Sequence, residues 1–179
     1  GNTNYTWRPV VTHSSGMNAK GWAYTFSASY RGADEAYFDG TNYDAKSLFV
    51  AIEKRFNDSH SLNFTGIYAQ NKRAKNAPLT DEAADLKGFK YNSYWGWQGD
   101  DKRNSRYKEV EEPIFMLTHY WTINENNRLT TSASYQFGKI GNSRLGYNGA
   151  NNPDPTYYRN MPSYFSGYHD RDGNFLGNQ

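Results

Sequence analysis

The fold of this chain is decided by the stretch Trp22-Ala23-Tyr24-Thr25-Phe26-Ser27-Ala28-Ser29-Tyr30-Arg31, in which aromatic or apolar residues alternate with small or polar ones. Successive side chains point to opposite faces of a β-strand, so residues 22–31 predict a strand with one apolar face and one polar face. Aromatic residues stand near both ends of the apolar face, and Ala28 lies inside it.

The same alternation recurs along the chain. Residues 46–56 place Leu48, Val50 and Ile52 on one face, and residues 61–70 and 128–138 follow the same period. The first segment is a weaker strand, and the fifth is apolar on both of its faces. We therefore expect six strands, at residues 4–13, 22–31, 46–56, 61–70, 113–123 and 128–138.

The connections between these segments fall into two length classes. Short polar turns occupy residues 16–21, 57–60 and 124–127, whereas long connections run over residues 32–44, 71–112 and 139–179. A transmembrane β-barrel has short turns at one membrane surface and long loops at the other. A tilted strand of about 9–11 residues spans the hydrocarbon layer. The sequence therefore predicts an all-β fold, an antiparallel transmembrane β-barrel segment with long extracellular loops and short periplasmic turns.

In such a segment the apolar side chains face lipid, and the small polar ones face inward. A slip of one residue in register would exchange the two faces. The residues expected on the lipid side are Trp22, Tyr24, Leu48, Ile52, Phe64, Tyr68, Leu129 and Tyr135.

Composition agrees with this interpretation. The chain has 179 residues, 36% of them hydrophobic and 17% aromatic, and its mean hydropathy is −0.98. Low mean hydropathy does not exclude a membrane strand, because such a strand needs an apolar residue only at every second position. The net charge of +2 arises from mixed signs and predicts no nucleic-acid surface. Cysteine is absent and the four histidines are scattered, so we expect no metal site.

Six strands are too few to close a barrel, because the smallest barrels have about eight. An open sheet in lipid would leave unpaired backbone groups along two edges, each costing several kcal/mol. We therefore expect residues 1–179 to form part of one larger barrel domain, of which a fragment is present here.

The connection over residues 71–112 contains two local signals. Thr80 followed by Asp81 and Glu82 predicts a helix start, and Gly88 predicts its end, so residues 81–87 should form a short helix. Aromatic residues and two arginines follow. They could bind a sugar or another planar ligand by stacking, or they could pack the loops against one another, and packing is favoured. The candidate ligand-binding residues are Tyr91, Tyr94, Trp95, Trp97, Arg103 and Arg106.

Sequence motifs for catalysis are absent. No glycine-rich phosphate loop or serine nucleophile elbow occurs, and no nucleophile stands beside a base. We therefore expect no enzymatic activity, no catalytic residue and no cofactor.

Several stretches, taken in order, resemble the β-barrel of a TonB-dependent outer-membrane receptor, of the large type with an N-terminal carboxypeptidase-regulatory-like domain. They cover nearly the whole chain. Each stretch alone is weakly specific for this family, and their occurrence in this order is fairly specific. The stretches are Gly21–Thr25, Tyr37–Thr41, His60–Thr65, Tyr91–Gly96, Arg103–Arg106, Leu117–Trp121, Asn152–Arg159 and Met161–Tyr164.

The resemblance implies a 22-stranded barrel in the bacterial outer membrane, filled by a plug and powered through the TonB complex. The implied function is energy-coupled nutrient uptake. The expected partners are the rest of the barrel with its plug, outer-membrane lipid, the TonB complex and a surface lipoprotein, with no nucleic acid. Neither a plug-like segment nor a TonB box is recognisable in residues 1–179.

Two other hypotheses for the fold and function are compatible with the sequence. A soluble carbohydrate-binding β-sandwich would explain Trp95 and Trp97 as a sugar platform, but not the two classes of loop length. A small complete outer-membrane barrel with an adhesin or structural role would explain the loop lengths, but not the small number of strands.

Overall fold

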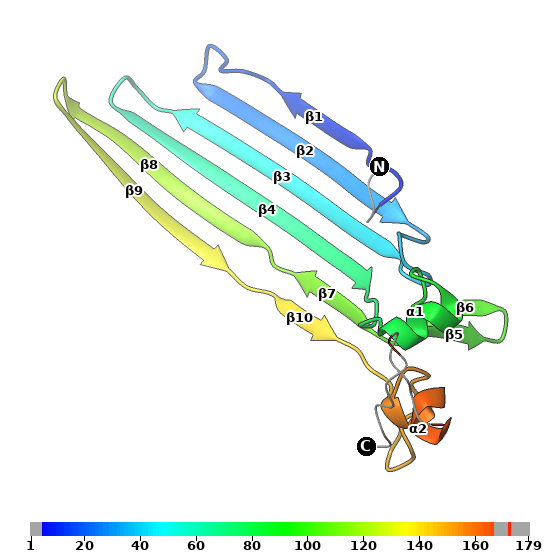
Figure 1. Cartoon of the computed structure of the whole chain (residues 1–179). Helices are drawn as coiled ribbons and strands as arrows, with labels where there is room; N and C mark the ends of the chain where they lie inside the picture. Colours follow the sequence, from blue (N-terminus) through cyan, green and yellow to red (C-terminus); the bar gives the residue numbers. More distant parts are fainter. Residues whose placement is uncertain (1–4, 167–171, 173–179) are drawn as a thin grey trace.

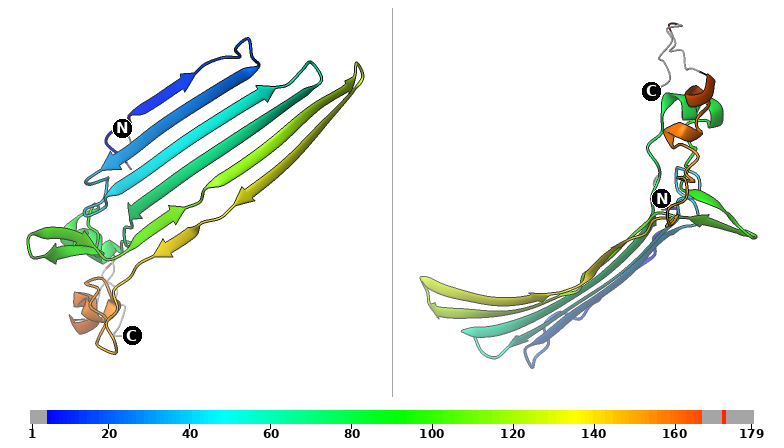
Figure 2. Two further views of the ribbon diagram at one scale, coloured as in Figure 1. Left: turned by 180° about the vertical axis from the view of Figure 1, so that it is seen from behind. Right: turned by 90° about the horizontal axis from the view of Figure 1, so that it is seen from below.

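A computed structural model describes residues 5–166 and 172 of the chain. Within this part, eight strands form one antiparallel sheet, and a two-stranded hairpin stands apart from it. The sheet is a single curved layer (Figures 1 and 2). The expected all-β, antiparallel class is thereby confirmed. The sheet consists of β1 Val10–Ser14, β2 Trp22–Ala33, β3 Tyr43–Arg55, β4 His60–Ala74, β7 Tyr107–Glu111, β8 Ile114–Asn124, β9 Asn127–Gln136 and β10 Lys139–Asn142.

The remaining elements lie beyond one end of the sheet (Figure 1). They are α1 Asp81–Lys87, the hairpin β5 Trp95–Gln98 with β6 Asp101–Asn104, a 3-10 helix Tyr158–Asn160, and α2 Pro162–Ser166.

β7 and β8 together form one interrupted strand beside β4. Ile67 pairs with Ile114 in β8, and Gln70 pairs with Glu111 in β7, so the register does not slip between the two strands. In the same way β9 and β10 run in one register along β8 and β7. The sheet thus has six strand positions, and these correspond to the six expected segments.

The interruptions have a local cause. Pro113 separates β7 from β8 and has no backbone N–H to donate to the ladder. Opposite it, the Phe137 N–H donates to the Pro113 carbonyl at 3.3 Å. A Cβ at Gly138 would lie only 2.1 Å from the Glu111 carbonyl oxygen. Glycine at this position therefore permits the close approach of the two interrupted strands.

The pairing places the apolar residues on one face, as the alternation predicts. One cross-strand row on this face runs Tyr24, Ile52, Phe64, Leu117, Ala133. The next row runs Phe26, Val50, Gly66, Phe115, Tyr135.

The opposite face is lined by small hydroxyl side chains, several of which bond to one another across strands. The hydroxyl oxygens of Thr12 and Ser27 are 2.8 Å apart, and those of Ser29 and Ser47 are 2.6 Å apart. An apolar island that the sequence analysis did not single out interrupts this polar face, where Phe49, Ile67 and Ile114 share a row.

The sheet has no hydrophobic core of its own. Tyr24, Leu48 and Leu117 on the apolar face are 51%, 48% and 46% exposed. On the polar face of β2, by contrast, residues 23–31 are half-buried at every second position. The apolar side chains are thus the more exposed ones, which reverses the arrangement of a sheet in water.

Three short turns lie together at one end of the sheet, opposite the hairpin and helices (Figure 1). All three are closed by asparagine side chains. Asn18 Oδ1 accepts from the Lys20 and Trp22 N–H groups at 2.9 and 3.0 Å. Asn57 Oδ1 accepts from the Ser59 and His60 N–H groups at 2.9 and 2.8 Å, and Asn124 Oδ1 accepts from the Asn126 N–H at 3.0 Å. The longest connection within the described residues, 75–106, lies at the opposite end of the sheet (Figure 1).

Several expected boundaries need correction. The first strand begins at Val10 rather than at residue 4, and an isolated bridge joins Trp7 to Gly32. The strands β2, β3 and β4 extend toward the loop end, so the connections at 32–44 and 71–112 are shorter than expected. The second of these also contains β5, β6 and β7. Residues 167–171 and 173–179 of the last connection lie outside the described part.

Replacing Gly138 by alanine should lower the free energy of unfolding by about 1–3 kcal/mol, because the added methyl group overlaps the backbone of β7. Gly141→Ala is the matched control, since a Cβ there meets only Glu109 Cβ, at 3.9 Å. Denaturant titration of both variants measures the difference. Equal stability of the two variants would contradict the close approach at Gly138.

Candidate functional site

The segments at the loop end of the sheet fold into one structure, which we call the cap. It comprises residues 34–42, 75–106 and 143–166. The described residues that are buried and hydrophobic lie in the cap or at the sheet end next to it. They are Ala33, Ala74, Ala77, Ala83, Ala84 and Met161. Five of these six residues are alanines, which bury little apolar surface, so hydrogen bonds contribute much of the cap's cohesion.

Helix α1 closes one side of the cap and matches its prediction at both ends. Thr80 accepts from the Ala83 N–H, and the Gly88 N–H donates to the Ala84 carbonyl. Ala83 and Ala84 are buried, so this short helix is held by packing as well as by its caps. Its Glu82 carboxylate accepts from the Ser163 N–H and hydroxyl at 2.9 and 2.7 Å, which ties the start of α2 to α1.

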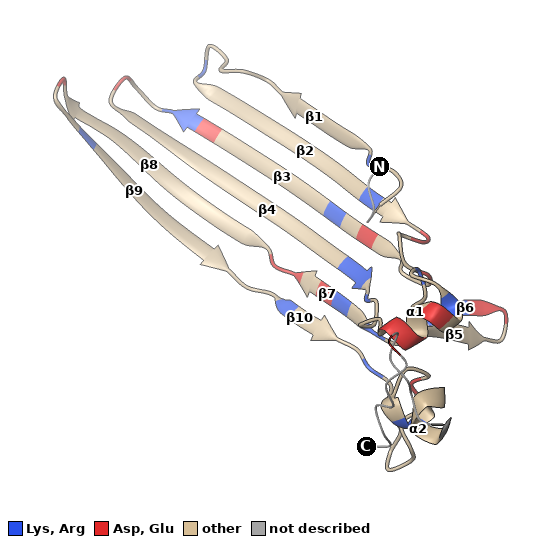
Figure 3. Cartoon of the chain, viewed as in Figure 1, with Lys and Arg blue, Asp and Glu red and all other residues tan. Residues whose placement is uncertain are grey.

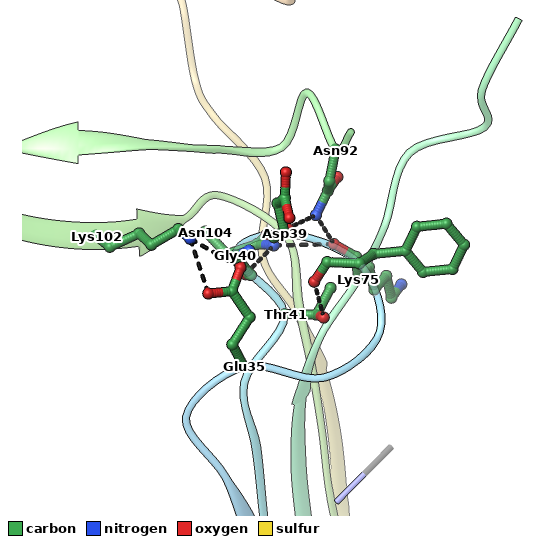
Figure 4. A network of polar contacts seen from close by, with 9 residues as sticks. Glu35, Asp39, Gly40, Thr41, Lys75, Asn92, Lys102 and Asn104 are labelled. Atoms are coloured by element: carbon green, nitrogen blue, oxygen red, sulfur yellow. Dashed lines mark hydrogen bonds and ion pairs between the residues drawn. The ribbon is translucent and has the colours of Figure 1, made fainter. Parts of the chain in front are cut away.

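Asn92 joins three segments of the cap and is 1% exposed. Its Nδ2 donates to the Asp39 and Lys75 carbonyls at 2.9 and 3.2 Å (Figure 4). Its Oδ1 accepts from the Ala77 and Tyr94 N–H groups at 2.9 and 3.1 Å. Its side-chain nitrogen and oxygen each therefore bond to two backbone groups of the cap, which accounts for the burial of this polar side chain.

Asn104 performs a second bridging role. Its Nδ2 donates to the Gly40 and Lys75 carbonyls at 3.0 and 2.9 Å, and its Oδ1 accepts from the Arg106 N–H at 2.8 Å. Both asparagines thus converge on the Lys75 carbonyl. Together they fix the loop 34–42 against the end of β4 (Figure 4).

An ion pair fixes the hairpin to the same loop. Lys102 Nζ lies 2.8 Å from Glu35 Oε1, and Glu35 Oε1 also accepts from the Gly40 N–H at 2.7 Å. The hydrogen bond from Lys102 holds the pKa of Glu35 below its usual range, although partial burial opposes this. Lys102 Nζ also lies 4.3 Å from the ring centre of Trp95.

Two of the six candidate ligand residues meet at a small cavity. Arg106 lies over the Tyr94 ring, with its guanidinium carbon 4.9 Å from the ring centre. Both residues line a cavity of about 70 Å³ beside Asp154. Such a cavity is too small for an organic ligand, since ligand pockets occupy about 300–1,000 Å³.

The other candidates are dispersed. Trp95 packs on Gly40, where a Cβ would meet its ring, and its indole N–H is buried without a hydrogen-bond partner. Trp97 is 67% exposed. Arg103 donates to Gln98 across the hairpin. Tyr91 is half-buried, and burial raises the pKa of its hydroxyl.

Arg103 and Arg106 were also candidates for pairing with acidic residues of the loops. Among the described residues neither arginine forms an ion pair, and Lys102 takes that role with Glu35. The structure therefore favours packing over ligand binding for Trp95, Tyr94 and Arg106. Trp97 alone keeps a large free aromatic surface.

A larger pocket, which the sequence analysis did not identify, lies where the loop 34–42 meets the ends of β3 and β4. Its volume is about 740 Å³, within the range of ligand pockets. Its signal in the sequence is the aromatic pair Tyr37-Phe38 with the nearby Tyr43, which lies inside a connection that the sequence analysis treats only as a long loop. The lining residues are Ala36, Tyr37, Phe38, Thr41, Asn42, Tyr43, Arg73, Ala74, Lys75 and Asn76.

Residues 5–166 and 172 contain no group of three or more His, Asp or Glu side chains that could hold a metal ion. His60 and His119 do meet on the apolar face, with Nδ1 and Nε2 3.1 Å apart. Across the described part of the chain, no helix is long and apolar enough to cross a membrane. Comparison with protein-family models, curated proteins and solved structures finds no match for the chain.

Replacing Asn92 by leucine should loosen the cap by about 3 kcal/mol, because buried backbone donors and acceptors lose their partner. Amide hydrogen exchange at Ala77 and Tyr94 should accelerate by roughly a hundredfold. The control is Asn76→Leu, since Asn76 is exposed and makes only a 3.4 Å bond to the Ala77 carbonyl. Unchanged exchange in the Asn92 variant would contradict the bridging role.

The tie between Glu35 and Lys102 should depend on pH. Because the folded-state pKa of Glu35 is lowered, its stabilising effect is complete above the unfolded-state value of about 4.3 and is lost as pH falls through the folded-state value. Proteolysis of the hairpin loop at residues 99–100 should therefore accelerate as the pH falls below the folded-state pKa of Glu35. Lys102→Met should produce the same acceleration near neutral pH, whereas Lys87→Met at the end of α1 should not. Equal protection in both variants would argue against the ion pair.

Proposed function

We propose that this chain forms part of the wall and the external loops of an outer-membrane β-barrel, as in a TonB-dependent receptor for energy-coupled nutrient uptake. In this role it contributes a path for a ligand and performs no chemistry. The observation that carries the proposal is the exposure of the apolar face of the sheet, beside a polar face that is half-buried along β2.

The charge distribution supports the same conclusion. The strands share a middle band without charged residues, and Lys, Arg, Asp and Glu stand toward the two ends of the sheet (Figure 3). On the apolar face of β3, Lys46 and Lys54 bound this band and lie about 26 Å apart along the strand. The apolar belt of a barrel is about 25 Å tall. The uncharged stretches are residues 22–30, 47–52, 60–71, 114–124 and 129–136.

Both edges of the sheet support a larger assembly. In the described residues, β1 pairs only with β2, and β9 pairs only with β8. Each outer edge therefore presents unpaired backbone groups, which lipid cannot satisfy. The proposed partners at these edges are other strands of the same barrel.

The polar face supports an inward orientation. Its hydroxyl pairs, such as Thr12 with Ser27 and Thr118 with Ser132, suit a wet lumen or contact with a polar plug. The TonB complex, the plug and a surface lipoprotein remain proposed partners on the strength of the resemblance alone.

The alternatives are less well supported. A β-sandwich needs two sheets packed face to face, whereas the described residues form one layer with both faces open (Figure 2). A small complete barrel would have to close on itself, yet β1 and β9 lie at opposite edges.

Adjacent single-cysteine variants test the proposal, because the chain has no native cysteine. In outer-membrane vesicles of the protein that contains this chain, a fluorophore on Phe64→Cys should be strongly quenched by brominated lipid. The same fluorophore on Thr65→Cys, which points to the opposite face, should be quenched only weakly.

Extraction of the protein provides the control. It should require detergent, since the exposed apolar face is otherwise in contact with water. Release by salt or alkali alone, or equal quenching at the two positions, would overturn the membrane assignment.

A further inference from the structure

The polar face of the sheet carries basic side chains without acidic partners at its cap end. Arg73 lies opposite Tyr43 in β3 and opposite Lys108 in β7, so these three side chains share the polar face. Arg31 reaches the same face one row nearer the turns, opposite Ala45.

The acidic residues that lie level with Arg73 and Lys108 along the strands are on the apolar face. Asp44 and Glu109 lie opposite Lys72, whose side chain points away from that of Arg73. Glu111 also faces the apolar side, where it bonds to Tyr68 and Lys139. The nearest acid on the polar face is Glu112, beside Ala69 and two rows toward the turns.

Two ion pairs lie on the apolar face near the cap, and among the described residues there Lys72 and Glu109 form none: Lys72 lies over the Tyr107 ring and Glu109 accepts from Gln70. Lys46 with Asp44 and Lys139 with Glu111 neutralise each other on the apolar face. Within the described part of the chain, Arg31, Arg73 and Lys108 have no acidic partner within ion-pair distance. Neighbouring positive charges without acidic partners repel one another, so the binding of an anion among them would be favourable.

The 740 Å³ pocket opens beside this group. Arg73, Lys75 and Tyr43 belong to its wall, and Tyr37 and Phe38 add two aromatic rings from the loop 34–42. Those rings stand edge to face, 5.1 Å apart, which gives the loop side a fixed aromatic surface. The amide side chains of Asn42 and Asn76 complete the polar lining.

We propose that this pocket binds a ring-bearing organic anion with more than one carboxylate. Arg73 in the pocket wall and Lys108, which lies outside the wall as the cross-strand neighbour of Arg73, neutralise its charge, and Tyr37, Phe38 and Tyr43 contact its ring. The pocket lies where the polar face meets the cap, so the inference rests on the proposed function and specifies the class of solute admitted at the barrel mouth. Neutral solutes lack the charge complement that these cations require.

Two kinds of compound supply this chemistry, so both serve as probes. Trigalacturonate offers carboxylates on sugar rings, and benzene-1,3,5-tricarboxylate offers them on an aromatic ring. Galactotriose is the neutral counterpart of the first. Calorimetry on the complete receptor in detergent should give a Kd for at least one acid at least about tenfold below that of galactotriose, and added salt should weaken the binding of the acid. The tighter of the two acids identifies the ring type.

Substitutions localise the site. Arg73→Gln combined with Lys108→Gln should weaken binding of the preferred acid by at least about tenfold. The matched control is Lys72→Gln combined with Lys46→Gln, which removes the same charge from the opposite face at the same height and should change binding less than about twofold.

Three results would overturn the inference: failure of both acids to bind with a Kd below about 1 mM, equal binding of galactotriose, or equal losses in the two double variants. The lipid-quenching pair Phe64→Cys and Thr65→Cys is measured on the same preparation. Normal quenching with no acid binding would refute only the pocket, whereas loss of the quenching difference would refute the barrel assignment itself.

Discussion

Backbone pairing along β4 is the constraint on which the rest of the structure depends. This strand keeps one register with β3 over its whole length and one register with β8 and β7 in succession. Because the register does not slip at Pro113, side chains from His60 to Ala74 keep the same alternation from the turns to the cap. A slip of one residue would move Phe64 to the hydroxyl-lined face and Arg73 away from Tyr43.

This constraint also explains how the cap is positioned. The end of β4 carries the Lys75 carbonyl to the point where Asn92 and Asn104 bind it. The hairpin and the loop 34–42, which connects β2 to β3, therefore share the Lys75 carbonyl as a common point of attachment, beside the backbone bonds Ala74 N–H to Asn42 and Lys75 N–H to Arg106. The cap has a small buried core and a satisfied polar network, whereas the sheet has neither a core nor a cover in the described residues. The two regions consequently depend on different surroundings for their stability.

The sequence predicted what is encoded locally. Alternation located the six strand positions, and Thr80 with Gly88 located α1 at both ends. The hairpin β5–β6 is not predicted by the sequence pattern, because its aromatic residues fit loop packing or ligand stacking equally without a strand. Its one local turn signal is Gly99, which adopts a positive φ of 62° between the two strands. The pairing of Glu35 with Lys102 joins residues 67 positions apart, and no local pattern encodes such a contact. The same holds for the larger pocket, whose walls come from two separate segments.

The distribution of charge separates structural requirements from ligand-related ones. On the apolar face Asp44 and Glu111 each have a lysine within ion-pair distance, and Glu109 accepts a hydrogen bond from Gln70, as expected where charges border an apolar belt. On the polar face the cations Arg31, Arg73 and Lys108 stand together without such partners, although mutual repulsion disfavours this arrangement. Folding of the strands does not require it, because a hydroxyl or amide at these positions would fit the same face, as Ser47 and Asn71 do in neighbouring rows. This group of cations destabilises the unliganded protein and is not needed for the fold. The proposed binding of an anion among the cations explains why they are present.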